Sequence, residues 1–302
     1  MQLTELATGL MFPEGPIAMP DGSVIVVEIA RGTLSRVQPD GSVQVIADLG
    51  GGPNGAAIGP DGACYVCNNG GMEFHRSPGG FLVPGEQPPG YETGRIERVD
   101  LDTGEVTWLY SECDGLALRG PNDIVFDAGG GFWFTDHGKT RSRERDRTGV
   151  FYAKADGSHI EEAIFPMEGP NGIGLSPDEE TLYVAETPTG RVWAYPIAAP
   201  GKIAADERPR MLAQRPDYHF FDSLAVDGEG NVCVATIVTG GITIHSPDGA
   251  TARLVEMPDP ITTNICFGGE DLKTAYVTLS ATQRLAACRW ETAGLPLNFL
   301  NN

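Results

Sequence analysis

The stretch PEGPIAMPDGSVIVVE, residues 13–28, holds a polar opening, a short apolar run, an Asp-Gly turn and a β-rich run that ends in a polar residue. The same order of features returns in PNGAAIGPDGACYVCN, residues 53–68. Similarity at a regular spacing is characteristic of proteins built from repeated supersecondary units. These two stretches therefore predict a repeat architecture.

Four further segments have the same order of features, so the chain contains six units. The openings of the units are Pro13-Glu14-Gly15-Pro16, Pro53-Asn54-Gly55, Pro121-Asn122-Asp123, Pro170-Asn171-Gly172, Phe221-Asp222-Ser223 and Thr263-Asn264-Ile265. The runs that follow are short, rich in β-branched and aromatic residues, and bounded by turn residues, which is typical of strands. Since no long stretch has helical periodicity, the pattern indicates an all-β fold.

Most units continue with a third strand, a second Asp-Gly turn and a fourth strand. Six four-stranded units around an axis predict a six-bladed β-propeller that occupies residues 1–302 as one domain. The sixth unit ends after its third strand, before the tail 294–302, and a spare strand, Leu3 to Ala7, precedes the first unit. We expect this N-terminal strand to complete the last blade, because closing the ring removes an open sheet edge. A β-sandwich would explain the strands but not the sixfold register.

The chain carries 41 acidic and 21 basic residues, which gives a formal charge of −20. Such a field repels nucleic-acid phosphates and anionic lipid, so we expect neither nucleic acid nor a membrane surface as a partner. Solubility is the simple explanation of this charge, and attraction of a cation to an acidic mouth is the alternative. We expect a monomer or a weak homo-oligomer.

Residues 1–10 lack the basic and apolar regions of a signal peptide, and no apolar run is long enough to span a membrane. These features predict a cytoplasmic protein. The chain has six cysteines, of which Cys64 and Cys67 form a CxxC without a second pair at zinc-site spacing. Because both lie in one strand-like run, their side chains should point to opposite faces. We therefore interpret the cysteines as buried thiols.

The first strand of each blade lines the central channel of a propeller, so each opening places one polar side chain at the same mouth. These side chains are Glu14, Asn54, Asn122, Asn171, Asp222 and Asn264. A single Asn or Asp beside Gly is usually a turn former, but six such side chains in register favour a site for a hard cation. Calcium, which takes about six to eight oxygen ligands, is the expected ion. The alternatives are Zn²⁺, Mn²⁺, Mg²⁺ and Fe²⁺, although no opening supplies the His or Cys that zinc prefers.

Four of the openings resemble the motifs of the gluconolactonase/regucalcin family (senescence marker protein type). They are Phe12–Pro16, Gly120–Asp123, Gly169–Gly172 and Phe221–Ser223. The similarity extends from Leu3 to Trp290, and it implies a six-bladed propeller that holds one divalent metal and hydrolyses sugar or other lactones to hydroxy acids. The resemblance also implies that the metal ligands are Glu14, Asn122, Asn171 and Asp222.

Two alternatives to a lactonase stay open. The related diisopropyl fluorophosphatase binds its catalytic calcium with the same Glu-Asn-Asn-Asp set, so the chain could hydrolyse organophosphates. Propellers also act as binding platforms, so a non-catalytic calcium-binding propeller is the other alternative. In one respect the chain departs from the pattern of the family. Sugar-lactone members similar to regucalcin carry an Arg where this chain has Gly120, with Arg119 beside it. This departure leaves room for a smaller or more apolar lactone.

Lactone hydrolysis requires a polarised carbonyl, an activated water and a proton for the ring oxygen as it leaves. A cation would polarise the carbonyl, and Asp222, the second carboxylate of the set, is expected to activate the water. His137 and His219 are candidates for transferring protons above the mouth. The alternative for each is a solvated histidine in a loop. A second polar ring either supports the metal ligands or caps strand ends; its members are Glu28, Asn68, Asp136, Glu186, Thr236 and Thr278.

The longest step between openings, from Asn54 to Asn122, contains an insertion over residues 70–93. Loops of this length are usually functional or disordered, and the aromatic residues and prolines here favour an ordered lid over the mouth. The stretch 137–148 is a basic patch that either meets a substrate carboxylate or an acidic neighbouring chain, or is a solvated loop. The residues that we assign to lactone binding are Asn54, Phe74, Tyr91, His137 and His219.

Overall fold

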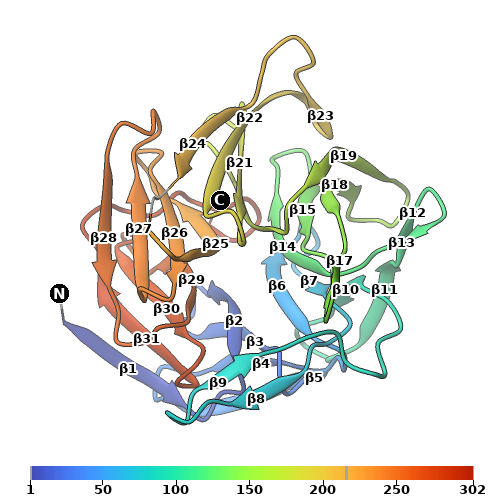
Figure 1. Ribbon diagram of the computed structural model, residues 1–302. Helices are drawn as coiled ribbons and strands as arrows, with labels where there is room; N and C mark the ends of the chain where they lie inside the picture. The colour runs from blue at the N-terminus through green and yellow to red at the C-terminus, as the bar shows by residue number, and fades with distance from the viewer. Residues whose placement is uncertain (1, 215–216, 302) are drawn as a thin grey trace.

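The computed structural model describes residues 2–214 and 217–301. Within these ranges it contains strands and no helix, and therefore no helix that could cross a membrane. Six antiparallel sheets stand around one axis (Figure 1), five of them with four strands and one with five. The predicted six-bladed β-propeller is confirmed.

The strands of each blade follow one another from the channel outwards. Blade 1 consists of β2 (Pro13–Ala18), β3 (Val24–Glu28), β4 (Thr33–Val37) and β5 (Val43–Asp48). Blade 2 consists of β6 (Pro53–Ile58), β7 (Cys64–Asn68), β10 (Arg95–Val99) and β11 (Val106–Tyr110). Blade 3 consists of β14 (Pro121–Phe126), β15 (Gly131–Asp136), β18 (Thr148–Lys154) and β19 (Ile160–Met167). Blade 4 consists of β20 (Pro170–Leu175), β21 (Thr181–Glu186), β22 (Arg191–Ala199), β23 (Lys202–Ile203) and β24 (Arg210–Gln214). Blade 5 consists of β25 (Phe220–Val226), β26 (Val232–Ile237), β27 (Gly241–His245) and β28 (Ala252–Glu256). Blade 6 consists of β29 (Thr262–Gly268), β30 (Thr274–Leu279), β31 (Arg284–Arg289) and β1 (Leu3–Thr8). Three short hairpins lie outside the blades: β8 (Phe74–Arg76) with β9 (Leu82–Pro84), β12 (Glu112–Cys113) with β13 (Leu116–Ala117), and β16 (Thr140–Arg141) with β17 (Glu144–Arg145).

The ring is closed by the N-terminal strand. Strand β1 pairs with β31 as the outermost strand of blade 6, so the expected closure is confirmed. The inner strands contact one another in the order β2, β6, β14, β20, β25 and β29, and β29 returns to β2. Because one sheet contains both ends of the repeat, neither the first nor the last blade presents an open side.

Every inner strand is irregular at its mouth end. The register shifts occur between Glu14 and Ile17, Pro53 and Ala56, Pro121 and Ile124, Pro170 and Ile173, Phe221 and Leu224, and Thr262 and Asn264. A β-bulge bends a strand and changes the direction of its side chains. Neighbouring backbones also approach closely here, since a Cβ on Gly172 would lie 2.6 Å from the Leu224 nitrogen. The shared bulge therefore sets the direction of the polar side chains at the openings.

The apolar core lies between neighbouring blades. One cluster joins Tyr65 of blade 2 to Phe126 and Phe132 of blade 3, with ring centroids 5.1 and 5.9 Å from that of Tyr65. Cys64 and Cys67 belong to different clusters, as expected for side chains on opposite faces of one strand. The six cysteines are free and buried, so their interpretation as buried thiols is confirmed.

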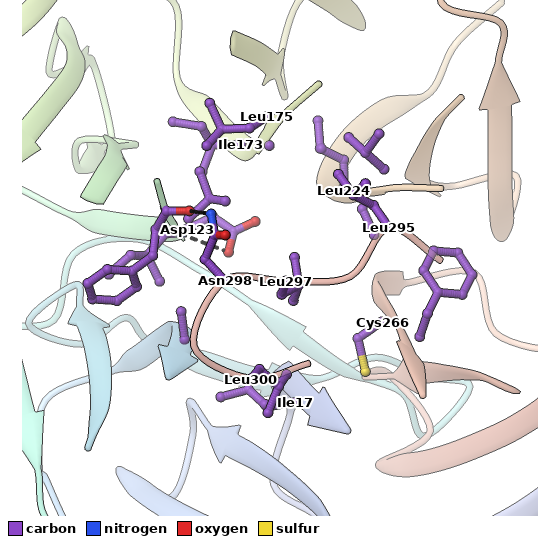
Figure 2. Close-up of a pocket in the computed structure, with 18 of the residues that line it drawn as sticks. Ile17, Asp123, Ile173, Leu175, Leu224, Cys266, Leu295, Leu297, Asn298 and Leu300 are labelled. Carbon is purple, nitrogen blue, oxygen red and sulfur yellow. Dashed lines mark hydrogen bonds between the residues drawn. The ribbon is translucent and has the colours of Figure 1, made fainter. Parts of the chain in front are cut away.

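The C-terminal tail closes the end of the channel that lies away from Glu14. Between this tail and the mouth residues Asp123 and Asn264, the inner strands surround a largely apolar cavity of about 350 Å³ (Figure 2). The Leu295 nitrogen donates to the Val226 carbonyl at 3.1 Å, and Asn298 Nδ2 donates to the Phe126 carbonyl at 3.2 Å. Three apolar side chains of the tail pack on three different clusters of the core; they are Leu295, Phe299 and Leu300. The tail therefore connects separate blades.

Deletion of residues 295–302 should lower the free energy of unfolding by roughly 2–4 kcal/mol, because three half-buried apolar side chains lose their packing. The midpoint of thermal unfolding, Tm, measures the effect. Leu297→Ala is the matched control in the same tail, since Leu297 is 41% exposed. A truncated chain with the Tm of this control would show that the tail does not stabilise the ring.

Candidate functional site

Glu14, at the start of β2, is almost completely buried. Its Oε2 atom accepts a hydrogen bond of 2.6 Å from Asn264 Nδ2 and another from the backbone N–H of Gly15. Its Oε1 atom is buried and has no hydrogen-bond partner among the residues that the structure describes. Burial raises the pKa of Glu14 to about 7, although these hydrogen bonds oppose the shift. The protein thus holds one carboxylate oxygen and leaves the other without a donor.

Asn122 and Asn171 are each 5% exposed. Asn122 Oδ1 is a second buried oxygen that has no hydrogen-bond partner within the described ranges. Asn171 Nδ2 donates to Thr187 Oγ1 at 3.0 Å, and the Ser223 hydroxyl donates to Asn171 Oδ1 at 3.4 Å. These bonds fix the orientation of the Asn171 amide.

Two further carboxyl groups lie within electrostatic reach of Glu14. Burial raises the pKa of Asp222 well above its usual value; the negative charge of Glu14 adds to this shift, and a hydrogen bond with Asn171 opposes it. Burial and the charge of Glu14 likewise raise the pKa of Asp123 to about 8. Carboxyl groups from blades 1, 3 and 5 therefore influence one another at the mouth.

Asp123 is not among the site residues that the sequence pattern predicts. One signal was available, because Asp123 occupies the position that glycine takes after Glu14, Asn54 and Asn171. Asn54 itself is buried beside β2, with its carbonyl oxygen 2.7 Å from the position of a Cβ on Gly15. Asn264, the sixth mouth residue, serves as a donor to Glu14.

The residues at the mouth fit a hard divalent cation. Glu14 Oε1 and Asn122 Oδ1 are buried oxygens without a donor from the described chain, and burial raises the pKa of the carboxyl groups of Glu14 and Asp222, because it disfavours their negative charge. Oxygen ligands of this kind are those that Ca²⁺ prefers. No group of three or more His, Cys, Asp and Glu side chains suited to a metal occurs in the described ranges, so amide oxygens are needed to complete a ligand set.

Four members of the second polar ring support the openings through their backbone, whereas the Thr236 hydroxyl contacts Thr243 and the Thr278 hydroxyl contacts Thr263. Asp136, at the end of β15, accepts hydrogen bonds of 2.7 Å from the backbone nitrogens of Arg119 and Gly120. Equivalent bonds in other blades join Glu28 to the Met11 nitrogen at 2.7 Å, Asn68 to the Gly52 nitrogen at 2.9 Å, and Glu186 to the Glu168 nitrogen at 3.0 Å. Each acceptor therefore holds the chain two or three residues before a mouth residue. The same hydrogen bonds cap strand ends and position the openings.

His137 follows β15 and borders the approach to Asn122. Its backbone nitrogen donates to the Gly120 carbonyl at 2.8 Å, and its Nε2 accepts from Arg145 Nη2 at 2.7 Å. Burial lowers the pKa of His137 to about 3, with the charges of Arg145 and Lys139 adding to the shift. His137 is therefore neutral near pH 7. Gly120 is also tightly enclosed, since a Cβ there would lie 2.8 Å from the Gly138 carbonyl oxygen. The backbone around Gly138 therefore does not accommodate an Arg at position 120.

His219 lies next to β25 and is 5% exposed. Its Nδ1 is 2.8 Å from the Asp217 carbonyl oxygen, and its ring centroid is 4.9 Å from that of Phe221. A Cβ on Gly190 would lie 2.9 Å from His219 Nε2, which places the ring beside blade 4. His219 is thus a buried side chain at the junction of blades 4 and 5 and not a solvated loop histidine.

The insertion over 70–93 contains the hairpin of β8 and β9. Phe74 packs on Phe12, two residues before Glu14, with ring centroids 5.1 Å apart. The Leu82 nitrogen donates to the Ala281 carbonyl at 3.0 Å, so the hairpin lies against blades 1 and 6. The insertion forms a defined hairpin next to the candidate site.

The end of the insertion is joined to the hairpin of β16 and β17. Tyr91 donates through its hydroxyl to the Arg119 carbonyl at 2.7 Å, and Lys139 Nζ lies 5.2 Å from the Tyr91 ring centroid. Lys139 Nζ also donates to the Gly71 carbonyl at 2.6 Å. Tyr91 therefore lies between the insertion and the approach to Asn122.

The chain is similar to known proteins in sequence and in architecture. The family model described as "SMP-30/Gluconolactonase/LRE-like region" matches residues 12–281. A gluconolactonase of Zymomonas mobilis is 26% identical over 321 residues, which cover 96% of this chain and 81% of the relative. A 6-deoxy-6-sulfogluconolactonase of Pseudomonas putida is 31% identical over 182 residues, 59% of this chain and 58% of the relative. A regucalcin of Agrobacterium tumefaciens, described as a calcium-binding protein, has a TM-score of 0.76 at 18% identity over 98% of both chains, which shows the common fold.

Asp136→Ala should lower the affinity of the mouth for a cation about 10–100-fold, the usual effect of losing a group that orients a ligand. The substitution frees the backbone that leads to Asn122. Calorimetric titration of chelator-treated protein with Ca²⁺ measures the affinity. Asp156→Ala is the matched control, because Asp156 lies in an exposed turn, where it accepts from the Ser158 nitrogen at 3.0 Å. Equal affinities in these two variants, with unchanged circular dichroism, would contradict the supporting role.

In chelator, the stability of the protein should fall as pH rises from about 4.5 to about 7. Burial raises the pKa of Glu14 from 4.5 to about 7, so the folded chain binds more protons than the unfolded chain in this window, and rising pH favours unfolding. Asp123, with a pKa of about 8, extends the fall. Thermal unfolding across this window measures the slope, which should be smaller in Glu14→Gln. A slope of opposite sign, or one unchanged in Glu14→Gln, would contradict the burial of an uncompensated carboxyl group.

Proposed function

The chain belongs to the SMP-30/gluconolactonase/LRE-like family, and from this membership we propose that it is a metal-dependent lactonase that opens a small γ- or δ-lactone to the hydroxy acid. The family resemblance of the openings is confirmed, and the named relatives are hydrolases of lactones. The observation that carries the proposal is the pair of buried oxygens without donors from the described chain, Glu14 Oε1 and Asn122 Oδ1, beside carboxyl groups of raised pKa.

The cation would be held by side chains of blades 1, 3, 4 and 5, which are Glu14, Asn122, Asn171 and Asp222. Calcium suits such oxygen ligands, and the similar regucalcin is described as a calcium-binding protein. Mn²⁺, Mg²⁺, Zn²⁺ and Fe²⁺ are alternatives. When bound, a divalent cation polarises a lactone carbonyl and lowers the pKa of a water molecule.

Asp222 is the proposed acceptor of the proton from the attacking water. Its burial and the charge of Glu14 raise its pKa in the metal-free chain, and a positive charge at the mouth would lower that pKa and favour the carboxylate. A positioned carboxylate of this kind typically contributes about 10²–10⁴-fold to a rate.

His137 is proposed as a neutral donor to the substrate. Its Nε2 accepts from Arg145, which assigns the ring proton to Nδ1. The ring lies beside the Pro170 carbonyl, one residue before Asn171, and the proposed role of its Nδ1–H is donation to the lactone ring oxygen as negative charge develops there. The other residues proposed to contact the substrate are Asn54, Phe74, Tyr91 and His219, with the hairpin of β8 and β9 as a lid.

Asp222→Asn should reduce kcat for lactone hydrolysis by about 10²–10⁴-fold while the protein retains most of its cation affinity. Acid release from a panel of sugar and aliphatic lactones, by chelator-treated protein reloaded with Ca²⁺, Mg²⁺, Mn²⁺, Zn²⁺ or Fe²⁺, measures turnover. Asp248→Asn, a substitution in an exposed turn, is the matched control.

Near-normal turnover of Asp222→Asn would exclude Asp222 as the base. Turnover of a phosphotriester in preference to every lactone would favour the organophosphate hydrolase. Stoichiometric cation binding without turnover of either substrate class would favour the non-catalytic calcium-binding propeller.

A further inference from the structure

The hairpin of β16 and β17 and its flanks concentrate positive charge in an acidic protein. Five basic residues alternate along this segment, namely Lys139, Arg141, Arg143, Arg145 and Arg147. Arg141 forms an ion pair with Asp146, with 2.5 Å between Nη2 and Oδ1, and Arg147 lies 3.5 Å from Glu168. Lys139 Nζ is held by Asn69 Oδ1 at 3.1 Å and by the Gly71 carbonyl. The positive charges of Arg141 and Arg147 are thus compensated by carboxylates.

Arg145 differs from its neighbours. It is partly buried and forms no ion pair with a residue of the described chain. Its Nη2 donates to His137 Nε2 at 2.7 Å, while its Nε is buried and has no acceptor in the same ranges. A guanidinium keeps its charge in a protein and presents its donors in a rigid fork. Glu168 and Asp146 lie within electrostatic reach of Arg145, but neither accepts from its Nε, and a buried donor left without an acceptor is costly.

The guanidinium of Arg145 lies beside the approaches to two candidate metal ligands. A Cβ on Gly169, two residues before Asn171, would lie 2.7 Å from Arg145 Cζ. His137, which accepts from Arg145, is bonded through its backbone nitrogen to Gly120, two residues before Asn122. Glycine at 169 leaves the space that the guanidinium occupies. Arg145 therefore stands where blades 3 and 4 meet at the mouth.

We propose that Arg145, supported by His137, forms a subsite for an anionic substituent, a carboxylate or sulfonate, on the lactone that the mouth receives. This inference rests on the proposed function and specifies its substrate class. The formal charge of −20 repels an anionic substrate, so a local cation that pairs with the substituent is required for binding. An oxyanion that accepts two N–H groups matches the geometry of the Arg fork.

The test compares lactones that differ only in the charge of one substituent. The neutral probe is gluconolactone, the sulfonate probe is 6-deoxy-6-sulfogluconolactone, and the carboxylate probe is the lactone with a terminal carboxylate in the same place. In Arg145→Met, kcat/KM for an anionic probe relative to the neutral probe should fall roughly 10–100-fold, the effect expected for a charge-assisted hydrogen bond. Arg145→Lys should restore part of this ratio. Arg147→Met, which removes an exposed charge two residues away, should leave the ratio unchanged.

A ratio that is unchanged in Arg145→Met, with all three lactones affected equally, would overturn the proposal and leave Arg145 a structural residue. A fall for only one anionic probe would identify the anion as sulfonate or carboxylate. If the wild-type protein hydrolyses no lactone, the proposed function fails. The subsite is then tested by calorimetric titration with 6-deoxy-6-sulfogluconate, and an affinity that does not decrease in Arg145→Met would overturn the subsite as well.

Discussion

Glu14, Asp123 and Asp222 come from three different blades, and burial raises the pKa of each. Gathering three carboxyl groups away from water is unfavourable unless protons or a cation compensate their charge. The closed ring imposes this arrangement, because each inner strand is held by its own sheet on the outside and by its two neighbours along the channel. An opening cannot move away from the axis without breaking these contacts. The negative charge at the mouth is therefore a consequence of the architecture, and it is the reason why a cation fits there.

The ring and the hairpins make separate contributions. The ring supplies the buried oxygens of Glu14 and Asn122, and the second polar ring holds the backbone that leads to them. The hairpin of β8 and β9 and the hairpin of β16 and β17 border the same mouth from different blades. Since hairpins tolerate sequence changes better than a closed ring, we infer that the chemistry is conserved by the ring and the choice of substrate is set by the hairpins. The hairpin of β16 and β17 supplies Arg145, which donates to His137, and the Gly138 carbonyl before it encloses Gly120.

The architecture could be predicted from the sequence because its information is local and repeated. Each opening with its Asp-Gly turn defines one inner hairpin, and six copies leave few ways to arrange the strands. The spare strand before Glu14 predicted the closure for the same reason. The role of Asp123 could not be predicted, because it depends on the bulge that redirects the strand and on the nearness of Glu14, which lies more than a hundred residues earlier. The neutral state of His137 depends likewise on burial and on the nearby charges of Arg145 and Lys139. The closure of the channel by Leu295 and its neighbours follows from packing against several blades at once, which no local pattern encodes.

Diffraction from crystals grown with Mn²⁺, recorded on both sides of the manganese absorption edge, tests most directly whether four blades share one cation. We expect a single anomalous peak at the mouth, in contact with oxygens of Glu14, Asn122, Asn171 and Asp222 and with a coordination position open to solvent. A peak at other residues, or the four side chains gathered without any peak around a sealed apolar plug, would contradict a catalytic metal centre in this propeller.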